Sequence, residues 1–163
     1  MLILNKMRKL FRSLTCIVKS IVDIYRYGGI RKVNVSYLSP DKQLDSKTIL
    51  ITGGGSGIGK SIAKASLRHG AKVIISGRNE QKLRDMIDDC KQDGLFNIKY
   101  IVSDISDISE IPNYVNVASN LFGCEVDILV NNAGVQPNEF FPSVSENEWD
   151  KVYAINSKGT FFI

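Results

Sequence analysis

The chain has 163 residues, of which 44% are apolar and 23% charged, and its formal net charge is +4. This composition predicts one ordinary globular domain and excludes collagen-like, low-complexity and disordered chains. Cys16, Cys90 and Cys124 are too far apart for a metal-binding or redox pair, and an odd number fits a disulfide framework poorly. We therefore expect no metal site, and a reducing compartment such as the cytoplasm is favoured.

The first 39 residues form a basic leader that holds eight of the 21 basic residues and only one of the 17 acids. Apolar residues recur every three or four positions along residues 6–26, which predicts an amphipathic helix with a basic polar face. Gly28 and Gly29 end the pattern, so residues 1–45 are assigned to this helix and a linker. Three roles stay open for the helix: peripheral membrane contact, packing on the main domain or a second subunit, and organelle targeting.

The remaining residues, 46–163, alternate between short apolar runs and longer amphipathic ones, which is typical of parallel strands joined by covering helices. Strands are predicted at residues 48–51, 72–76, 98–103 and 126–130. Helices are predicted at residues 58–69, 80–90 and about 108–122, and another begins after Ser145, which forms a capping box with Glu148. The fold class is therefore α/β, a doubly wound parallel sheet of Rossmann type, truncated after about four strands in the order 3-2-1-4.

A glycine-rich turn, Thr52–Gly59, joins the end of the first predicted strand to the first helix of this domain. Its sequence is Thr-Gly-Gly-Gly-Ser-Gly-Ile-Gly. Glycines let the backbone approach a pyrophosphate closely, and the N-terminus of the helix offers unpaired N–H groups to the anion. The order of strand, turn and helix favours a dinucleotide site over a purely structural connection.

Together with three further matches, this turn resembles the short-chain dehydrogenases/reductases. The second motif is Asn-Asn-Ala-Gly at 131–134, after the fourth predicted strand. The third is Asp104-Ile105 after the third strand, and the fourth is Asn156 in the last helix. The resemblance covers about residues 46–163 and implies that they are the N-terminal part of an NAD(P)-binding domain.

The resemblance also implies roles for single residues. The phosphate and ribose end of the dinucleotide would lie on the glycine-rich turn, at Gly53, Gly55, Ser56, Gly57, Ile58 and Gly59. Asp104, with Ile105 beside it, would bind the adenine amino group, and Asn131 would stabilise the central sheet. The ribose on the nicotinamide side would be lined by Asn132, Ala133 and Gly134. From the residues alone, Asp104 serves equally well as a helix cap.

The end of the second predicted strand bears on the choice between NAD and NADP. An acid there would accept hydrogen bonds from the ribose hydroxyls of NAD, but the chain has Gly77, Arg78 and Asn79, and no acid before Glu80. The guanidinium of Arg78 offers paired donors to a 2′-phosphate, and Asn79 stands beside it. NADP is therefore favoured over NAD, with a merely solvated Arg78 as the alternative.

The reaction that the resemblance implies is hydride transfer between a nicotinamide and a carbonyl or hydroxyl carbon of a small molecule. The family uses a Tyr-x-x-x-Lys pair, a Ser and an Asn. Of these only the Asn has a counterpart, Asn156, whose alternative role is structural. No tyrosine of the chain has a lysine four residues later. We therefore expect the cofactor-binding part of an oxidoreductase, without turnover as this chain, and a homo-oligomer at full length.

Two other functions stay open at this point. The domain could bind a dinucleotide without catalysis, or it could be a membrane-tethered remnant in which the basic leader is the functional part. A nucleic-acid partner is not expected, because the excess of basic residues sits on one short helix without a recognition motif.

Overall fold

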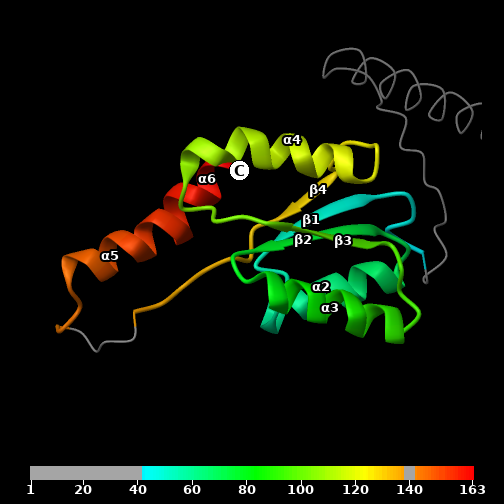
Figure 1. Cartoon of the computed structure of the whole chain (residues 1–163), viewed down its shortest axis with the longest axis horizontal. Helices are drawn as coiled ribbons and strands as arrows, with labels where there is room; N and C mark the ends of the chain where they lie inside the picture. The colour runs from blue at the N-terminus through cyan, green and yellow to red at the C-terminus, as the bar shows by residue number, and fades with distance from the viewer. Residues whose placement is uncertain (1–41, 138–141) are drawn as a thin grey trace, which may run out of the picture. The chain divides into compact units, whose positions relative to one another are not determined.

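A parallel sheet forms the centre of the described part of the chain, which comprises residues 42–137 and 142–163 of the computed structural model. Its strand order is β3-β2-β1-β4, as predicted (Figure 1). The strands are β1 (Thr48–Thr52), β2 (Lys72–Gly77), β3 (Ile98–Val102) and β4 (Ile128–Val130). The basic helix predicted along residues 6–26 lies outside the described residues, so its three possible roles stay predictions.

The central strand β1 is buried along its whole length. One edge pairs with β2, from Thr48 opposite Lys72 to Thr52 opposite Ser76, and the other edge pairs with β4. Helices cover both faces of the sheet (Figure 1). A strand in this position has no side that faces water, which explains why its sequence is continuously apolar or β-branched.

Alternate residues of β1 and β2 point to opposite faces of the sheet and belong to two separate hydrophobic cores. The first core lies under α2 (Gly57–Arg68) and α3 (Glu80–Gln92), where Ile51 and Ile75 are fully buried. The second lies under α4 (Ile111–Leu121), where Leu50, Ile74, Tyr114 and Ala118 pack together. The two cores fix which face of the sheet each helix covers, and both faces are occupied in Figure 1.

The last helical segment begins as predicted but changes its winding. The capping box of Ser145 and Glu148 opens α5 (Glu146–Tyr153). The helix then widens into a π-helix, η2 (Ala154–Gly159), and closes with α6 (Thr160–Phe162). Local propensities give no signal for such a widened turn, which is frequent at functional sites.

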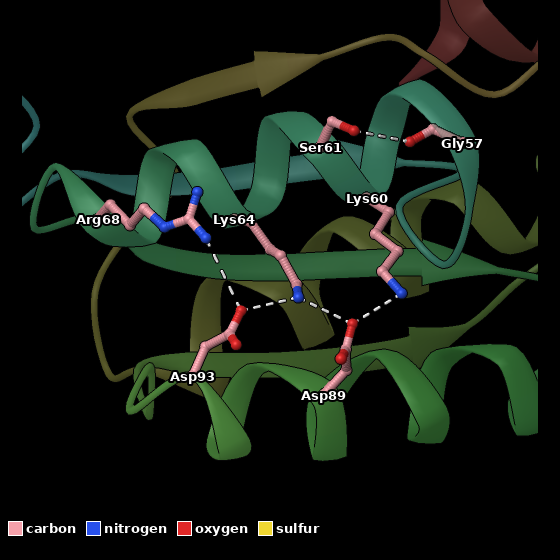
Figure 2. A network of polar contacts seen from close by, with 7 residues as sticks. All are labelled: Gly57, Lys60, Ser61, Lys64, Arg68, Asp89 and Asp93. Carbon is pink, nitrogen blue, oxygen red and sulfur yellow. Dashed lines mark hydrogen bonds and ion pairs between the residues drawn. The ribbon is translucent and has the colours of Figure 1, made fainter.

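Charged side chains tie α2 to α3 across their exposed sides (Figure 2). The ammonium of Lys64 lies 2.8 Å from a carboxylate oxygen of Asp89 and 2.8 Å from one of Asp93. Lys60 lies 2.7 Å from the same oxygen of Asp89, and Arg68 lies 3.8 Å from Asp93. The four-residue spacing on each helix places all these groups on facing sides. Hydrogen bonds from Lys60 and Lys64 lower the pKa of Asp89 to about 2.

We expect Asp89→Asn to reduce the stability of the chain at neutral pH and to matter less in acid. The pKa of Asp89 in the folded state, about 2, is below the ordinary value of 3.8. Its ionised form therefore stabilises the fold above about pH 4, and this contribution is lost as the pH falls towards 2. Urea unfolding measures the free energies of unfolding of the parent chain and of Asp89→Asn. The difference between them should shrink as the pH is lowered from 7 to 2.

Asp88→Asn is the matched control for this experiment. Asp88 pairs with Lys91 inside α3, at 3.0 Å, so its loss leaves the contacts between the helices intact. Its effect at pH 7 should be the smaller of the two. A difference between Asp89→Asn and the parent chain that stays constant across the whole pH range would contradict the assignment.

Candidate functional site

The carboxyl ends of the four strands open onto a cavity of about 130 Å³. The predicted cofactor residues in its lining are Gly53, Arg78, Asp104, Ile105, Ala133 and Gly134. A second hollow of about 480 Å³ shares Arg78, Ser103 and Asp104 with the first and continues along α4. The other predicted cofactor residues, which are outside both linings, are Gly55, Ser56, Gly57, Ile58, Gly59, Asn79 and Asn132. A crevice beyond the carboxyl ends of the strands is where open α/β sheets bind ligands.

Thr52, the last residue of β1, joins the two motifs that the sequence singles out. Its Oγ1 accepts hydrogen bonds from the backbone N–H groups of Asn132 and Ala133, both at 3.0 Å. The same hydroxyl donates to the carbonyl of Val130 at 3.4 Å. With 1% of its surface exposed, Thr52 is the buried joint between the glycine-rich turn and the segment after β4. Sequence reasoning gave it no role, although a hydroxyl at the end of an apolar strand was a usable signal.

The bracing role predicted for Asn131 is carried by Asn132. The Nδ2 of Asn132 donates to the carbonyls of Thr52, at 2.9 Å, and of Gly53, at 3.2 Å. Asn131 is exposed. The reason is the register after β4: the bond from the backbone of Asn132 to Thr52 brings the side chain of Asn132, not that of its neighbour, against the end of β1.

The glycine-rich turn is held in a conformation that side chains would not allow. Gly53 and Gly57 have φ angles of +67° and +54°, in the region that favours glycine. A Cβ at Gly53 would lie 2.9 Å from the Cα of Ala133. A Cβ at Gly59 would lie 2.5 Å from both the Nδ2 of Asn132 and the carbonyl oxygen of Gly53. The first turn of α2 can therefore approach the end of β1 only because position 59 has no side chain.

The N-terminus of α2, like that of α4, has no side-chain cap, whereas those of α3 and α5 are capped. Ser56 is its N-cap residue but makes no side-chain hydrogen bond to the helix. By contrast, Asn79 caps α3 by accepting from the N–H of Lys82 at 3.0 Å, and Ser145 caps α5. The first turn of α2 contains no acidic residue. Its N–H groups are thus left to an external acceptor, and this arrangement fits the phosphate of a dinucleotide.

Arg78 and Asp104 face each other where the two hollows meet. An Nη atom of Arg78 lies 3.8 Å from one carboxylate oxygen of Asp104, and the other oxygen accepts hydrogen bonds from the backbone N–H and the hydroxyl of Ser106. Burial opposes ionisation of Asp104, but the bonds from Ser106 and the charge of Arg78 outweigh it, so its pKa lies below the ordinary value. The capping role considered for Asp104 belongs to Asp107, which accepts from the N–H of Ser109. Asp104 is therefore an anionic acceptor at the crevice.

Asn156 lies in the π-helix and holds the backbone that follows β4. Its Oδ1 accepts from the N–H of Val135 at 2.9 Å, and its Nδ2 donates to the carbonyl of the same residue at 2.8 Å. Val135 and Gly134 line the smaller cavity. The amide of Asn156 thus fixes the rim of the crevice, and a catalytic contact from this residue stays a prediction.

The described residues were also compared with the requirements of a metal site and of a membrane-spanning helix, and they meet neither. Between residues 42 and 137 and from 142 to 163, no group of three or more His, Cys, Asp or Glu side chains is placed to hold a metal ion. Within the same ranges, no helix has the length and apolar character needed to cross a membrane.

Comparison with known proteins agrees with this geometry. The model of the short chain dehydrogenase family matches residues 47–163. An uncharacterised oxidoreductase of Staphylococcus aureus (strain USA300) is 34% identical over 119 residues, which cover 73% of this chain and 50% of the relative. The 3-oxoacyl-(acyl-carrier-protein) reductase FabG of Rickettsia prowazekii (strain Madrid E) is 38% identical over 120 residues, or 74% and 46% of the two chains.

A solved structure gives the same result. The crystal structure of a short chain dehydrogenase from Mycobacterium smegmatis aligns with a TM-score of 0.67 and 28% identity, over 73% of this chain and 50% of that one. The chain spans about half the length of the curated relatives it matches. With its strand order, its glycine-rich turn and the family match over most of its length, the chain belongs to the short-chain dehydrogenase family.

Proposed function

We propose that this chain is the cofactor-binding part of an NADP-preferring oxidoreductase that acts on a carbonyl or alcohol group of a small molecule. The observation that carries the preference is Arg78, which stands just after β2 and lines both hollows of the crevice. Its side chain is 52% exposed, and its contact with Asp104, at 3.8 Å, is long for an ion pair. The guanidinium of Arg78 could therefore donate two hydrogen bonds to a 2′-phosphate without first breaking a strong ion pair.

The other residues of the crevice would each bind a different part of the cofactor. The N-terminus of α2 and the turn from Gly53 would hold the pyrophosphate, and Asp104 would accept from the adenine amino group. Ala133 and Gly134, held in place through Thr52, would lie along the ribose on the nicotinamide side. The bound nicotinamide would supply the hydride or accept it. Because no tyrosine of the chain has a lysine four residues later, we propose cofactor binding and not turnover for this chain by itself.

The test is a comparison of two adenosine ligands that differ only at the 2′-position. Adenosine 2′,5′-bisphosphate should bind the chain about tenfold more tightly than 5′-AMP, because two charge-assisted bonds to Arg78 are gained. Arg78→Ala should abolish this preference while the affinity for 5′-AMP changes less than about twofold. Isothermal titration calorimetry measures both dissociation constants.

Arg68→Ala is the matched control, since it also removes an exposed arginine but at the far end of α2. This variant should keep the preference for the bisphosphate. Equal affinity of the parent chain for the two ligands, or a preference that survives Arg78→Ala, would refute the proposed NADP preference.

A further inference from the structure

Glu80, the first acid after β2, is held by two side chains from different elements. Arg84 donates to its Oε1 from Nε at 3.1 Å and from Nη2 at 2.7 Å. The hydroxyl of Tyr100, on β3, donates to the same oxygen at 2.9 Å. The guanidinium carbon of Arg84 also lies 5.8 Å from the centre of the Tyr100 ring. Three donor atoms thus converge on one carboxylate oxygen, and we call these three residues the Glu80 clamp.

The Glu80 clamp lies next to the cofactor site without lining it. Glu80 opens α3 only two residues after Arg78, so its backbone lies beside the place where a 2′-phosphate would bind. Arg78 lines both hollows of the crevice, whereas Glu80 lines neither. The carboxylate is directed instead to the next turn of α3 and to β3.

A carboxylate released from this clamp would oppose a 2′-phosphate in two ways. It would add a negative charge near the dianionic phosphate, and it could pair with Arg78 and occupy the donors that the phosphate needs. The ordinary pKa of this carboxyl group, 4.5, is well below neutral pH, so the group would keep its charge after release from Arg84 and Tyr100. Neither effect would weaken the binding of a ligand with only a 5′-phosphate, because that phosphate is attached to C5′, on the opposite side of the ribose from the 2′-oxygen.

We propose that Arg84 and Tyr100 are specificity-determining residues that favour NADP by holding the Glu80 carboxylate away from the 2′-position. The inference rests on the proposed function of Arg78 and adds two residues that act indirectly on the same preference. One arginine binds the phosphate, and the other withdraws the acid that would compete with it. Arg84 and Tyr100 act through Glu80 and need not touch the cofactor.

The test is a mutant cycle in the chain itself, with adenosine 2′,5′-bisphosphate and 5′-AMP as the two probes. Arg84→Gln combined with Tyr100→Phe should weaken binding of the bisphosphate about fivefold and leave binding of 5′-AMP unchanged. The loss should shrink when the salt concentration is raised, because the interaction is electrostatic and partly exposed.

Glu80→Gln provides the control that separates charge from structure. Glu80→Gln alone should keep the preference of the parent chain, and its addition to the double variant should restore the lost affinity, since no carboxylate is left to release. If the triple variant binds the bisphosphate as weakly as the double variant, the effect is structural and the inference is overturned. Circular dichroism and thermal midpoints establish that each variant is folded before titration.

The outcomes also separate this inference from the proposed function. If the parent chain does not prefer the bisphosphate, the NADP preference fails, and the role of the Glu80 clamp fails with it. If the parent chain prefers the bisphosphate and the double variant keeps that preference in full, Arg78 stands as the determinant and only the role of Arg84 and Tyr100 is overturned.

Discussion

Thr52→Val should lower the free energy of unfolding by about 2–4 kcal/mol, although valine has nearly the same shape as threonine. The substitution removes the acceptor of two backbone N–H groups, those of Asn132 and Ala133, in a place where 1% of the Thr52 surface reaches water. Each buried N–H left without a partner costs about 1–3 kcal/mol, whereas the gain from burying one more methyl group is below about 1 kcal/mol. Urea unfolding followed by circular dichroism measures the difference.

Thr52→Ser is the matched control, because it keeps the hydroxyl and loses only a methyl group. It should cost about 1 kcal/mol, mostly from the lost apolar contact. A loss below about 1 kcal/mol in Thr52→Val would mean that the two N–H groups find other acceptors, which contradicts the joint described above. The valine variant should also bind the whole dinucleotide NADPH more weakly, because Ala133 lines the crevice where we propose that the ribose on the nicotinamide side lies.

Gly59→Ala should destabilise the chain by about 3 kcal/mol, the upper end of what overpacking costs. The new Cβ would lie 2.5 Å from the carbonyl oxygen of Gly53, which is backbone, and 2.5 Å from the Nδ2 of Asn132, which hydrogen bonds to the carbonyls of Thr52 and Gly53 hold in place. Alanine normally favours a helix over glycine by about 1 kcal/mol, so the measured loss is what remains after that gain. Thermal and urea unfolding of the variant give the value.

Gly57→Ala serves as the control two residues earlier in the same turn. Its φ of +54° makes alanine unfavourable, but nothing lies within 4 Å of the new Cβ. The cost should therefore be only the left-handed penalty of about 1–2 kcal/mol. If Gly59→Ala costs no more than Gly57→Ala, α2 can shift away from β1, and the close approach is not what fixes the turn.

The strand order and the two faces of the sheet could be predicted because they depend on local patterns. Continuous apolar runs indicate strands covered on both faces, and the helices between them require right-handed crossovers. The predicted start of the fourth strand, at residue 126, is two residues earlier than in the structure. The reason is Asp127: its backbone N–H still donates to the carbonyl of Thr48, but the N–H of Thr48 donates to the carboxylate of Asp127 and not to a backbone carbonyl.

In the candidate site, too, the features that depend on local sequence could be predicted, and those that depend on distant residues could not. Glycines at Gly53 and Gly59 could be placed from a motif, because the motif itself encodes a turn that only glycine allows. The clamp around Glu80 could not, since Tyr100 reaches it from a strand 20 residues away. The π-helix that carries Asn156 was also hidden, because a widened turn depends on what packs against it: a Cβ at Gly159 would collide with the backbone of Ile105.

The central position of β1 also determines the order in which the strands can pair while the chain is being synthesised. Its first neighbour, β2, emerges soon after it, but the groups that bind Thr52 from the other side follow about 80 residues later. During synthesis, β1, β2 and β3 can assemble with α2 and α3 while the second edge of β1 still waits for β4. Closing of the sheet and completion of the crevice are thus one event. Until that event a dinucleotide has only half a site, and the open strand edge is exposed to pairing with other chains.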